Sequence, residues 1–529
     1  MTEMPARRPC AAEIALSYHE RTKHRLERYA AGPETLDWDD QPNPFREFEG
    51  CSRITLDPTA DRPATTFGQL QAPVPGLSTP VSVDSIGTLL ALSLGLSAWK
   101  EYGPDRWAVR CNPSSGNLHP TEAYVLSIGT PGLADGLYHY LSRDHVLEQR
   151  CCLETHQPSG LWIALSSVHW REAWKYGERG FRYCQLDIGH AVGSIRYAAG
   201  ALGWTAKVVS QLGSRELQVL MGLDRDDDFT GVEREDPDLL IAIGPESGPP
   251  APWPVERRRW TGKANRLDRH PMYRWPVIDQ VSSATASRCA EPPRLEWPRY
   301  PQRDHRSTAA AADIILNRRS AQRYDGKFTV SAAVLYQMLD SLLLRPAAPL
   351  DVWDHAPRIH PVFFIHRVEA LEPGLYILVR RPDAEHALRD SLTSDFIWRK
   401  PAGAPDHLPF FKLAEGDYRK HSRTLNCHQA IARDGCFSLS MLSEFEPIVQ
   451  ADPWRYRQLH WEAGLLGQVL YLEAEAADLR GTGIGCYFDD VLHDLLGITD
   501  RRFQALYHFT VGRALLDDRI ITLPPYPNR

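Results

Sequence analysis

The sequence lacks the features that mark secreted, membrane-spanning or nucleic-acid-binding proteins. No apolar run follows the first residues, so we expect no secretory signal. The most hydrophobic stretch, Ile86 to Trp99, is interrupted by Gly and Ser and is too short to span a bilayer, so it predicts a buried helix. A net charge of −7 leaves no basic excess for nucleic acid. These absences predict a cytoplasmic protein with neither membrane nor nucleic-acid partners.

The chain also lacks a recognisable cysteine motif. Its ten cysteines include no Cys-x-x-Cys pair, and their spacing fits no zinc site, so we expect no metal ion. Cys151 and Cys152 are adjacent and leave a redox-active pair open as an alternative. Reduced thiols in a cytosolic protein are the simpler interpretation.

Length and composition indicate more than one domain. A chain of 529 residues is too long for a single hydrophobic core, and 43% hydrophobic with 24% charged residues is typical of globular proteins. Residues 1–80 are polar and rich in Pro and Gly, which predicts an N-terminal extension. Prolines crowd residues 246–306 and block regular helix and strand pairing, which predicts an extended surface connector. Two α/β-like regions remain, residues 81–245 and 307–529.

The two regions repeat each other in sequence. A His119-Pro120 step followed by Gly136-Leu-Tyr138 recurs as His360-Pro361 followed by Gly374-Leu-Tyr376. Apolar residues then recur at helical spacing from residue 188 to 202 and from 461 to 479. Each predicted helix leads to a strand-like segment, a short Leu-Gly helix and an apolar closing strand. A duplication explains this shared order, and its long period indicates paired domains.

An arginine-rich turn is one candidate binding element. Arg318, Arg319 and Ser320 follow a predicted helix that ends near Asn317. Two guanidinium groups and a hydroxyl offer donors suited to a phosphate, and Arg519 after the last strand is expected to add a third cation. The motif alone is weak, because arginines at helix ends commonly meet solvent or acidic side chains.

A glycine-rich segment, residues 481–485, is a second candidate. It follows a helix and precedes a strand, which reverses the strand-turn-helix order of the dinucleotide-binding fingerprint and excludes that interpretation. Gly483 and Gly485 still allow backbone amides to approach a flat ring closely. We therefore expect them beside a ring-containing ligand.

A polar turn in the first region is a third candidate. Pro113, Ser114, Ser115 and Asn117 supply two hydroxyls and an amide. These side chains either face a ligand or cap the structure that follows, and the turn alone does not distinguish the two.

The adjacent Lys175 and Tyr176 form the catalytic candidate. A lysine beside a tyrosine can act in acid–base chemistry when partial burial lowers the lysine pKa. The alternative is that Lys175 and Arg179 pair with Glu172 and Glu178 on a helix surface.

Taken together, these motifs resemble the FMN-dependent nitroreductase superfamily, and more closely its SagB-type (ThcOx-like) dehydrogenase branch in a tandem-domain form. The resemblance covers most of the chain. It is carried by Tyr18 to His24, Gln41 to Phe45, Arg110, Pro113 to Gly116, His119-Pro120, Trp174 to Arg179, Arg318 to Ser320, Glu462 to Gly464, Gly483, Gly485 and Val511-Gly512.

The resemblance implies an α+β fold of two nitroreductase-like α/β/α sandwich domains in tandem, forming an intramolecular pseudo-dimer. It places one FMN at the interface of the two halves. Arg318, Arg319, Ser320, Gly483, Gly485 and Arg519 would come from the C-terminal half, and Pro113, Ser114, Ser115 and Asn117 from the N-terminal half. The pseudo-symmetric second site lacks the corresponding residues, so we expect it to be incomplete. Gln322 replaces a usually basic residue, for which Arg323 is expected to compensate.

The resemblance also implies an activity. In azole-forming members of the branch a Lys-Tyr pair is catalytic, so Lys175 would be the substrate base, assisted by Tyr176. We expect a dehydrogenase or oxidase acting on a small-molecule or peptide-derived natural-product intermediate, of the azoline-to-azole type, with O₂ as acceptor and other biosynthetic enzymes as partners. The alternatives are an NAD(P)H-dependent nitro or quinone reductase and a non-catalytic partner of a modifying complex. Further homodimerisation stays open.

Overall fold

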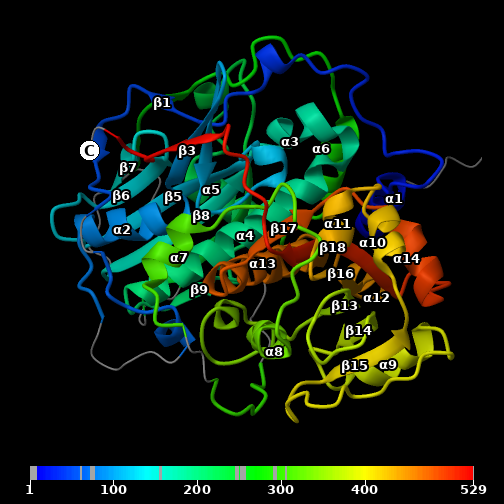
Figure 1. Cartoon of the computed structure of the whole chain (residues 1–529). Helices are drawn as coiled ribbons and strands as arrows, with labels where there is room; N and C mark the ends of the chain where they lie inside the picture. Colours follow the sequence, from blue (N-terminus) through cyan, green and yellow to red (C-terminus); the bar gives the residue numbers. More distant parts are fainter. Residues whose placement is uncertain are drawn as a thin grey trace, which may run out of the picture.

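A computed structural model describes residues 9–59, 62–71, 78–153, 158–244, 249–250, 258–289, 295–303 and 307–527. Its two main sheets lie on either side of two long helices, α4 (Gly180–Ala201) and α13 (Arg455–Ala476), which cross the middle of the molecule (Figure 1). Both helices occupy the segments in which apolar residues recur at helical spacing.

The first main sheet is antiparallel and has the strand order β11-β7-β6-β5-β8-β10-β9, with β2 paired to β7. Apart from β2 and β11, its strands are built from residues 121–243, and most of their side chains are buried. The strands are β2 (Arg53–Thr55), β5 (Thr121–Ile128), β6 (Gly136–Leu141), β7 (Val146–Leu153), β8 (Gly160–Ser167), β9 (Ala206–Val208), β10 (Asp236–Ile243) and β11 (Arg258–Trp260).

The second main sheet has the order β15-β14-β13-β16-β18-β17 and is also antiparallel. Its β14-β13-β16-β18-β17 run has the same chain order as β6-β5-β8-β10-β9 in the first sheet, and in both a long helix precedes the edge strand. The strands are β13 (Ile359–Ile365), β14 (Gly374–Leu378), β15 (Phe410–Glu415), β16 (Phe437–Glu444), β17 (Arg480–Ile484) and β18 (Phe503–Gly512).

Shorter helices cover the sheets and connect their strands. Among them, α5 and α14 each end on a glycine in the left-handed conformation, Gly222 and Gly497, which is a common helix terminus. These are the two short Leu-Gly helices that the sequence predicts. The shorter helices are α1 (Ala11–Arg21), α2 (Val83–Ser93), α3 (His169–Tyr176), α5 (Ser214–Met221), α6 (Pro276–Ala284), α7 (Ala311–Asn317), α8 (Ala332–Ser341), α9 (Ala384–Ser391), α10 (Arg419–Leu425), α11 (Ala430–Asp434), α12 (Glu446–Ala451) and α14 (Asp489–Leu496).

Helices α4 and α13 touch backbone to backbone. A Cβ atom on Gly189 would overlap the carbonyl oxygen of Trp461, and one on Gly464 would overlap that of Leu186. Only glycine allows this approach, and the buried side chains around it belong to a core cluster that includes residues of both sheets. The two halves are therefore joined through a shared interior.

Chain segments at both ends of the sequence bind the first half. β1 (Phe48–Glu49) pairs with β12 (Lys263–Ala264). β19 (Ile521–Leu523), in the red segment of Figure 1, pairs with β3 (Leu96–Tyr102), which also pairs with β4 (Asp105–Arg110). The C-terminal segment thus returns to the N-terminal half and lies across the boundary between the two.

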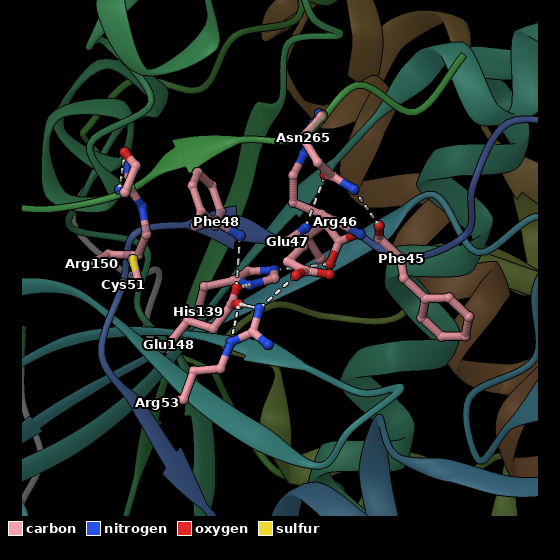
Figure 2. Close-up of polar contacts among 12 residues, drawn as sticks. Phe45, Arg46, Glu47, Phe48, Cys51, Arg53, His139, Glu148, Arg150 and Asn265 are labelled. Carbon is pink, nitrogen blue, oxygen red and sulfur yellow. Dashed lines mark hydrogen bonds and ion pairs between the residues drawn. The ribbon is translucent and has the colours of Figure 1, made fainter. Parts of the chain in front are cut away.

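A buried polar network holds the N-terminal extension to the first sheet (Figure 2). The backbone N–H of Phe48 and the guanidinium of Arg53 both donate to Glu148, at 2.9 and 2.8 Å. Burial disfavours the charged form of His139, but the carboxylates of Glu122 and Glu148 on either side of it raise its pKa to about 9. The imidazolium that results balances these buried carboxylates.

The prediction of one buried helix from Ile86 to Trp99 is wrong in its second part. Helix α2 ends at Ser93, and β3 begins at Leu96. Gly95 lies in the turn between them, where its N–H donates to the carbonyl of Leu90, and the following residues pair with β4 and β19. Strand pairing on both sides of β3 outweighs the helical propensity of this stretch.

The expectation of a wholly extended connector also fails. Residues 246–306 contain β11, β12 and helix α6, although residues 246–248, 251–257, 290–294 and 304–306 lie outside the described part. Pro276 opens α6 at the first helical position, where its missing N–H leaves no hydrogen bond unmade. Proline therefore begins this helix and does not block it.

Candidate functional site

A cavity of about 710 Å³ is lined by residues of both halves. A volume of this size is typical of sites for small molecules and cofactors. Ten of the predicted site residues line it: Pro113, Ser114, Ser115, Asn117, Tyr176, Arg318, Arg319, Ser320, Gly483 and Gly485. The structure thus brings together motifs that are about two hundred residues apart.

The turn between β4 and β5 forms one wall. Gly116, Asn117 and His119 all have positive φ, which non-glycine residues rarely adopt. The Asn117 side chain donates to the carbonyl of Ala108 at 2.9 Å, and the Ser114 hydroxyl accepts the N–H of His119 at 2.8 Å. These two side chains hold the turn in shape, as the capping alternative expects, while the turn itself borders the cavity.

The catalytic candidates at the end of α3 lie against this turn. A Cβ built on Gly116 would be 2.5 Å from the Tyr176 hydroxyl and 3.2 Å from Lys175 Nζ. Tyr176 and Gly116 line the cavity. Lys175 does not line it, but its side-chain nitrogen lies close to Gly116. The absence of a side chain at position 116 therefore lets both polar groups approach the cavity.

Two buried carboxyl groups lie beside the lysine. Asp187 on α4 accepts hydrogen bonds from the N–H and hydroxyl of Ser115, at 3.1 and 3.3 Å. The buried carboxyl groups of Glu172 and Asp187 also lie within hydrogen-bond reach of each other. Burial, and then the nearby charge of Asp187, raises the pKa of Glu172 well above its usual range. Burial also raises the pKa of Asp187, so this pair of carboxyl groups favours the uptake of a proton.

Burial lowers the pKa of Lys175, and the nearby Glu172 opposes this shift without cancelling it. The alternative of surface ion pairs fails for the neighbouring charges: Arg179 is buried and pairs with Asp489 at 3.1 Å, and Glu178 pairs with Arg21. This environment favours the neutral amine of Lys175, which is the form that can accept a proton.

A cluster of cations forms another part of the cavity wall. It consists of Arg318, Arg319, Arg480 and Lys100, of which only Lys100 comes from the N-terminal half. Burial, and then charge repulsion within the cluster, lowers the pKa of Arg319 to about 10. Burial also lowers the pKa of Lys100, with Arg319 and Arg480 adding to the shift. Such a cluster favours a bound anion.

Arg318 is the most buried cation of the cluster. Its Nη2 donates to the carbonyl of Arg110 at 3.0 Å, and its guanidinium lies 5.0 Å from the centre of the Tyr471 ring. Within the described part of the chain its Nε has no hydrogen-bond partner, and neither Arg318 nor Arg319 forms an ion pair with an acid. A buried donor without a partner points to a ligand that is not part of the protein.

Tyr471 on α13 joins the arginine turn to the glycine segment. Its hydroxyl lies 2.8 Å from the Ser320 hydroxyl and accepts the N–H of Gly483 at 2.9 Å. The glycine segment is the edge strand β17, where a Cβ on Gly483 would overlap the Tyr507 hydroxyl. The glycines make room for aromatic side chains of the protein and also border the cavity.

Arg519 does not join the cation cluster. Its side chain is 71% exposed, pairs with Asp517 at 2.7 Å and is absent from the cavity lining. The guanidinium of Arg519, which the sequence places in the site, forms an ion pair with Asp517 two residues earlier. Gln322 lines the cavity and Arg323 does not, so the additional positive charge comes from Lys100 and Arg480.

Several lining or neighbouring groups were missed in the sequence. Lys100 and Arg480 are single cations on strands, and no motif marks them. Asp187 is an acidic residue within a run of apolar helical positions, and that pattern does signal a buried polar group. The missed lining residues are Lys100, Asp187, Tyr471, Arg480 and Cys486.

The vicinal cysteines lie away from this cavity. Cys151 and Cys152 are consecutive on β7, where neighbouring side chains point to opposite faces of the sheet. Burial raises the pKa of Cys151 to about 11, which makes its thiol unreactive. Among the described residues there is also no group of three or more His, Cys, Asp or Glu side chains placed to hold a metal ion, and no helix long and apolar enough to cross a membrane.

Comparison with known proteins identifies the fold. No family model matches the chain. A protein of Methanocaldococcus jannaschii described as a nitroreductase is 23% identical over 180 residues, which is 32% of this chain and 82% of that one. The crystal structure of an Anabaena variabilis protein described as a nitroreductase covers 95% of this chain and 99% of its own, with 23% identity and a TM-score of 0.68. The chain therefore has a nitroreductase-like α+β fold.

A third similarity is much weaker. The structure of an Exiguobacterium sibiricum nitroreductase in complex with FMN covers 39% of this chain and 88% of its own, with 14% identity and a TM-score of 0.23. An overlap this slight carries no argument about the cofactor of this chain.

Proposed function

We propose that the protein is an FMN-dependent oxidoreductase of the nitroreductase superfamily, in its SagB-type branch, which binds one flavin between its two halves. The observation that carries this proposal is the cation cluster of Lys100, Arg318, Arg319 and Arg480, which opens into a cavity beside Lys175 and Tyr176. The cluster suits a phosphate, and the polar turn with Lys175 and Tyr176 suits the reacting part of a ligand.

The fit to FMN rests on the donors of this chain. The unpartnered Nε of buried Arg318 is a donor in need of an acceptor, and a phosphate oxygen supplies one. Arg319, Ser320 and Arg480 would complete the phosphate site, while the turn from Ser114 to Asn117 would border the ring. FMN when bound supplies a two-electron acceptor for the substrate.

We propose further that the chain is a fused pseudo-dimer of two domains, residues 81–245 and 307–529. Equivalent contacts in the two halves support this: the N–H of Ser115 donates to Asp187 on α4, and the N–H of Arg358 donates to Glu462 on α13 at 3.0 Å. In the second half, however, Arg380 pairs with Glu462 and the serines are absent. This difference supports a single working flavin site.

Lys175 would act as the base in a dehydrogenase. Its lowered pKa makes the neutral amine available, and it would remove a proton from the substrate while Tyr176 holds the adjacent polar atom. Glu172 acts on this pKa in the opposite direction, but burial has the larger effect. A substrate base supports oxidation of an organic compound, for which we propose a peptide-derived azoline-type intermediate with O₂ as acceptor.

The proposal is tested by the colour and redox behaviour of the purified protein. We expect a yellow protein with bound FMN that NADPH does not reduce rapidly in the absence of oxygen. Rapid anaerobic bleaching by NADPH would instead identify a nitro or quinone reductase. A protein that stays colourless after FMN is added would be a non-catalytic partner, and that result would refute the enzyme proposal.

A further inference from the structure

Cys427 and Cys486 bring their sulfur atoms to 2.7 Å although they are 59 residues apart. This separation is longer than a disulfide bond, which is about 2.05 Å, and shorter than the contact distance of two unbonded sulfur atoms, so a small movement would join them. Cys486 follows β17 and lines the cavity, whereas Cys427 lies in the turn after α10. The pair therefore stands at the cavity wall.

The backbone around Cys427 has an unusual conformation that side-chain hydrogen bonds hold in place. Cys427 and His428 both have positive φ, which costs energy in residues other than glycine. Asn426 anchors this turn by donating to the carbonyl of Ser422 at 2.7 Å, and its side-chain oxygen lies 2.9 Å from His508 Nδ1. Gln429 donates to the carbonyl of Cys486 at 3.2 Å. The contacts of Asn426 hold the turn to α10 and β18, and the contact of Gln429 joins it to the segment that carries Cys486.

His24 lies against the sulfur atom of Cys486. The N–H of Ala30 donates to His24 Nδ1 at 2.9 Å, so the proton of the neutral ring is on Nε2. The hydrogen bond to Cys427, followed by the effect of His24, lowers the pKa of Cys486 to about 5, whereas the pKa of Cys427 is raised. These shifts favour the thiolate at Cys486 and the thiol at Cys427.

The surroundings of the pair contain few opposing charges. Arg179 donates to the carbonyl of Gly485 at 3.2 Å and adds positive charge near Cys486. The charge of Asp489 opposes it but is paired with Arg179 and Arg182. Among the described residues, the titratable and charged groups that face the two sulfurs are His24 and Tyr29 from the N-terminal segment, Tyr176, Arg179 and Tyr183 from the α3–α4 region, and Asp489 at the start of α14.

We propose that Cys427 and Cys486 form a redox-active dithiol that hydrogen peroxide converts reversibly into a disulfide at the cavity wall. The Cys486 thiolate attacks one peroxide oxygen, the O–O bond breaks, and the departing hydroxide takes up a proton to leave as water. The sulfur of Cys427 then attacks the sulfenic sulfur of Cys486, the S–O bond breaks, and the proton of Cys427 leaves with the hydroxyl group as a second water. Two thiols are oxidised by two electrons, and one peroxide is reduced to two waters.

This site goes beyond the proposed flavin chemistry and does not depend on it. If the protein returns electrons from reduced flavin to O₂, hydrogen peroxide forms beside Cys486. The thiol chemistry itself requires only peroxide from any source, and a dithiol reductant reverses it by thiol–disulfide exchange. Tests of this pair therefore measure the oxidation state of the two sulfur atoms and not the turnover of a substrate.

The test uses the full-length protein, reduced with dithiothreitol, desalted and exposed to increasing hydrogen peroxide. Peptide mapping by mass spectrometry without reduction should show a cross-link between the Cys427 and Cys486 peptides at peroxide concentrations that leave exposed Cys10 and Cys289 unmodified. Dithiothreitol should remove it. Oxidation of Cys10 and Cys289 before any cross-link forms would overturn the proposal.

Two single substitutions separate the roles of the sulfurs. Cys427→Ser should leave a sulfenic acid on Cys486 that dimedone traps, whereas Cys486→Ser should abolish both the cross-link and dimedone labelling at this site. Cys151→Ser, on β7, is the matched control and should leave the cross-link unchanged. Equal thermal midpoints would show that the variants are folded. Failure of Cys427→Ser to accumulate sulfenic acid at Cys486 would contradict the assignment of the attacking thiolate.

The pH dependence gives an independent check. The rate of cross-link formation should stay nearly constant from neutral pH downward and fall only as the pH approaches about 5, where Cys486 takes up a proton. A rate that rises tenfold per pH unit through neutral pH would mean an ordinary thiol and would overturn the proposal. The apoprotein and the protein supplied with FMN should behave alike, so failure of this proposal is distinguishable from failure of the flavin proposal.

Discussion

The guanidinium of Arg318 donates a hydrogen bond to the backbone carbonyl of Arg110, 3.0 Å away and 208 residues earlier in the chain. Arg110 ends β4 in the first half, and Arg318 follows α7 in the second. This bond ties the arginine turn to the segment that leads into the polar turn at Pro113. The two sets of predicted binding residues are therefore held in one place by a direct contact between the halves.

Arg318→Ala should weaken FMN binding. A hydrogen bond to a charged group contributes about 1.5–3 kcal/mol, which corresponds to about a 10- to 100-fold higher Kd. Titration of the apoprotein followed by flavin fluorescence measures the effect. Arg519→Ala is the matched control, because Arg519 is exposed and paired with Asp517, and it should leave the Kd unchanged. Equal affinities of the two variants would contradict the assigned phosphate site.

Lys175→Gln should retain the flavin and lose turnover. Removal of a general base typically costs about 10²–10⁴-fold in rate, and the loss should fall on kcat more than on KM. Lys175→Arg keeps the positive charge but cannot supply a neutral amine, so it should be equally inactive. A Lys175→Arg enzyme with near-normal kcat would show that position 175 contributes only charge.

The rate of the wild-type enzyme should increase with pH. Lys175 must be neutral to accept a proton, and burial lowers its pKa. The rising limb of kcat/KM should therefore have an apparent pKa below the ordinary lysine value of about 10.4. A profile measured with Lys175→Gln should lack this limb. A rising limb that persists in the variant would assign the titration to another group.

Gly116→Ala should impair turnover through Tyr176. An added Cβ would lie 2.5 Å from the Tyr176 hydroxyl, and the positive φ of 61° adds strain of about 1–2 kcal/mol. Gly103→Ala is the matched control, because its φ is 59° and no atom lies within 4 Å of the added Cβ. Both variants should lose stability in urea unfolding, Gly116→Ala more than Gly103→Ala because of the contact with Tyr176, but only Gly116→Ala should lose turnover. Equal turnover would refute the contact.

Glu172→Gln should remove a pH dependence of stability. In the folded protein the pKa of Glu172 is raised well above its usual range, whereas in the unfolded chain Glu172 releases its proton above about pH 4.3. Above about pH 4.3 the folded state therefore binds more protons than the unfolded state. Between this pH and the raised pKa of Glu172, the residue lowers the free energy of unfolding by up to about 1.4 kcal/mol for each unit of rising pH. Urea midpoints of the wild type and Glu172→Gln should diverge with rising pH. Glu27→Gln, which removes an exposed carboxylate, is the control. Parallel curves for wild type and Glu172→Gln would show that Glu172 is ionised.

The repeated fold is largely predictable from the sequence, because periodic apolar residues and paired motifs specify local structure. The two long helices and the closing strands β10 and β18 lie where these patterns place them. The stretch from Ile86 to Trp99 is not predictable in this way, since pairing of β3 with β4 and the distant β19 decides its conformation. Local patterns carry no information about a partner strand some four hundred residues away.

The candidate site is predictable only in part, for a similar reason. Motif residues such as Ser115 and Arg318 stand out in the sequence, and the structure brings them to one cavity. Lys100 and Arg480 belong to no motif and become part of the site only when β3 and β17 come together. The charge of Arg519 predicts that it joins the site, but its guanidinium pairs with the nearer carboxylate of Asp517. Such competition between partners is visible only in three dimensions.

The central claim is that one FMN binds between the two halves of each chain. Its most direct test is the ratio of flavin to protein after the apoprotein is saturated with FMN and unbound flavin is removed, measured by absorbance against quantitative amino-acid analysis. The account predicts one FMN per chain in the wild type and a marked loss in a variant that combines Arg318→Ala with Arg480→Ala. A ratio of two, or no bound flavin at all, would contradict it.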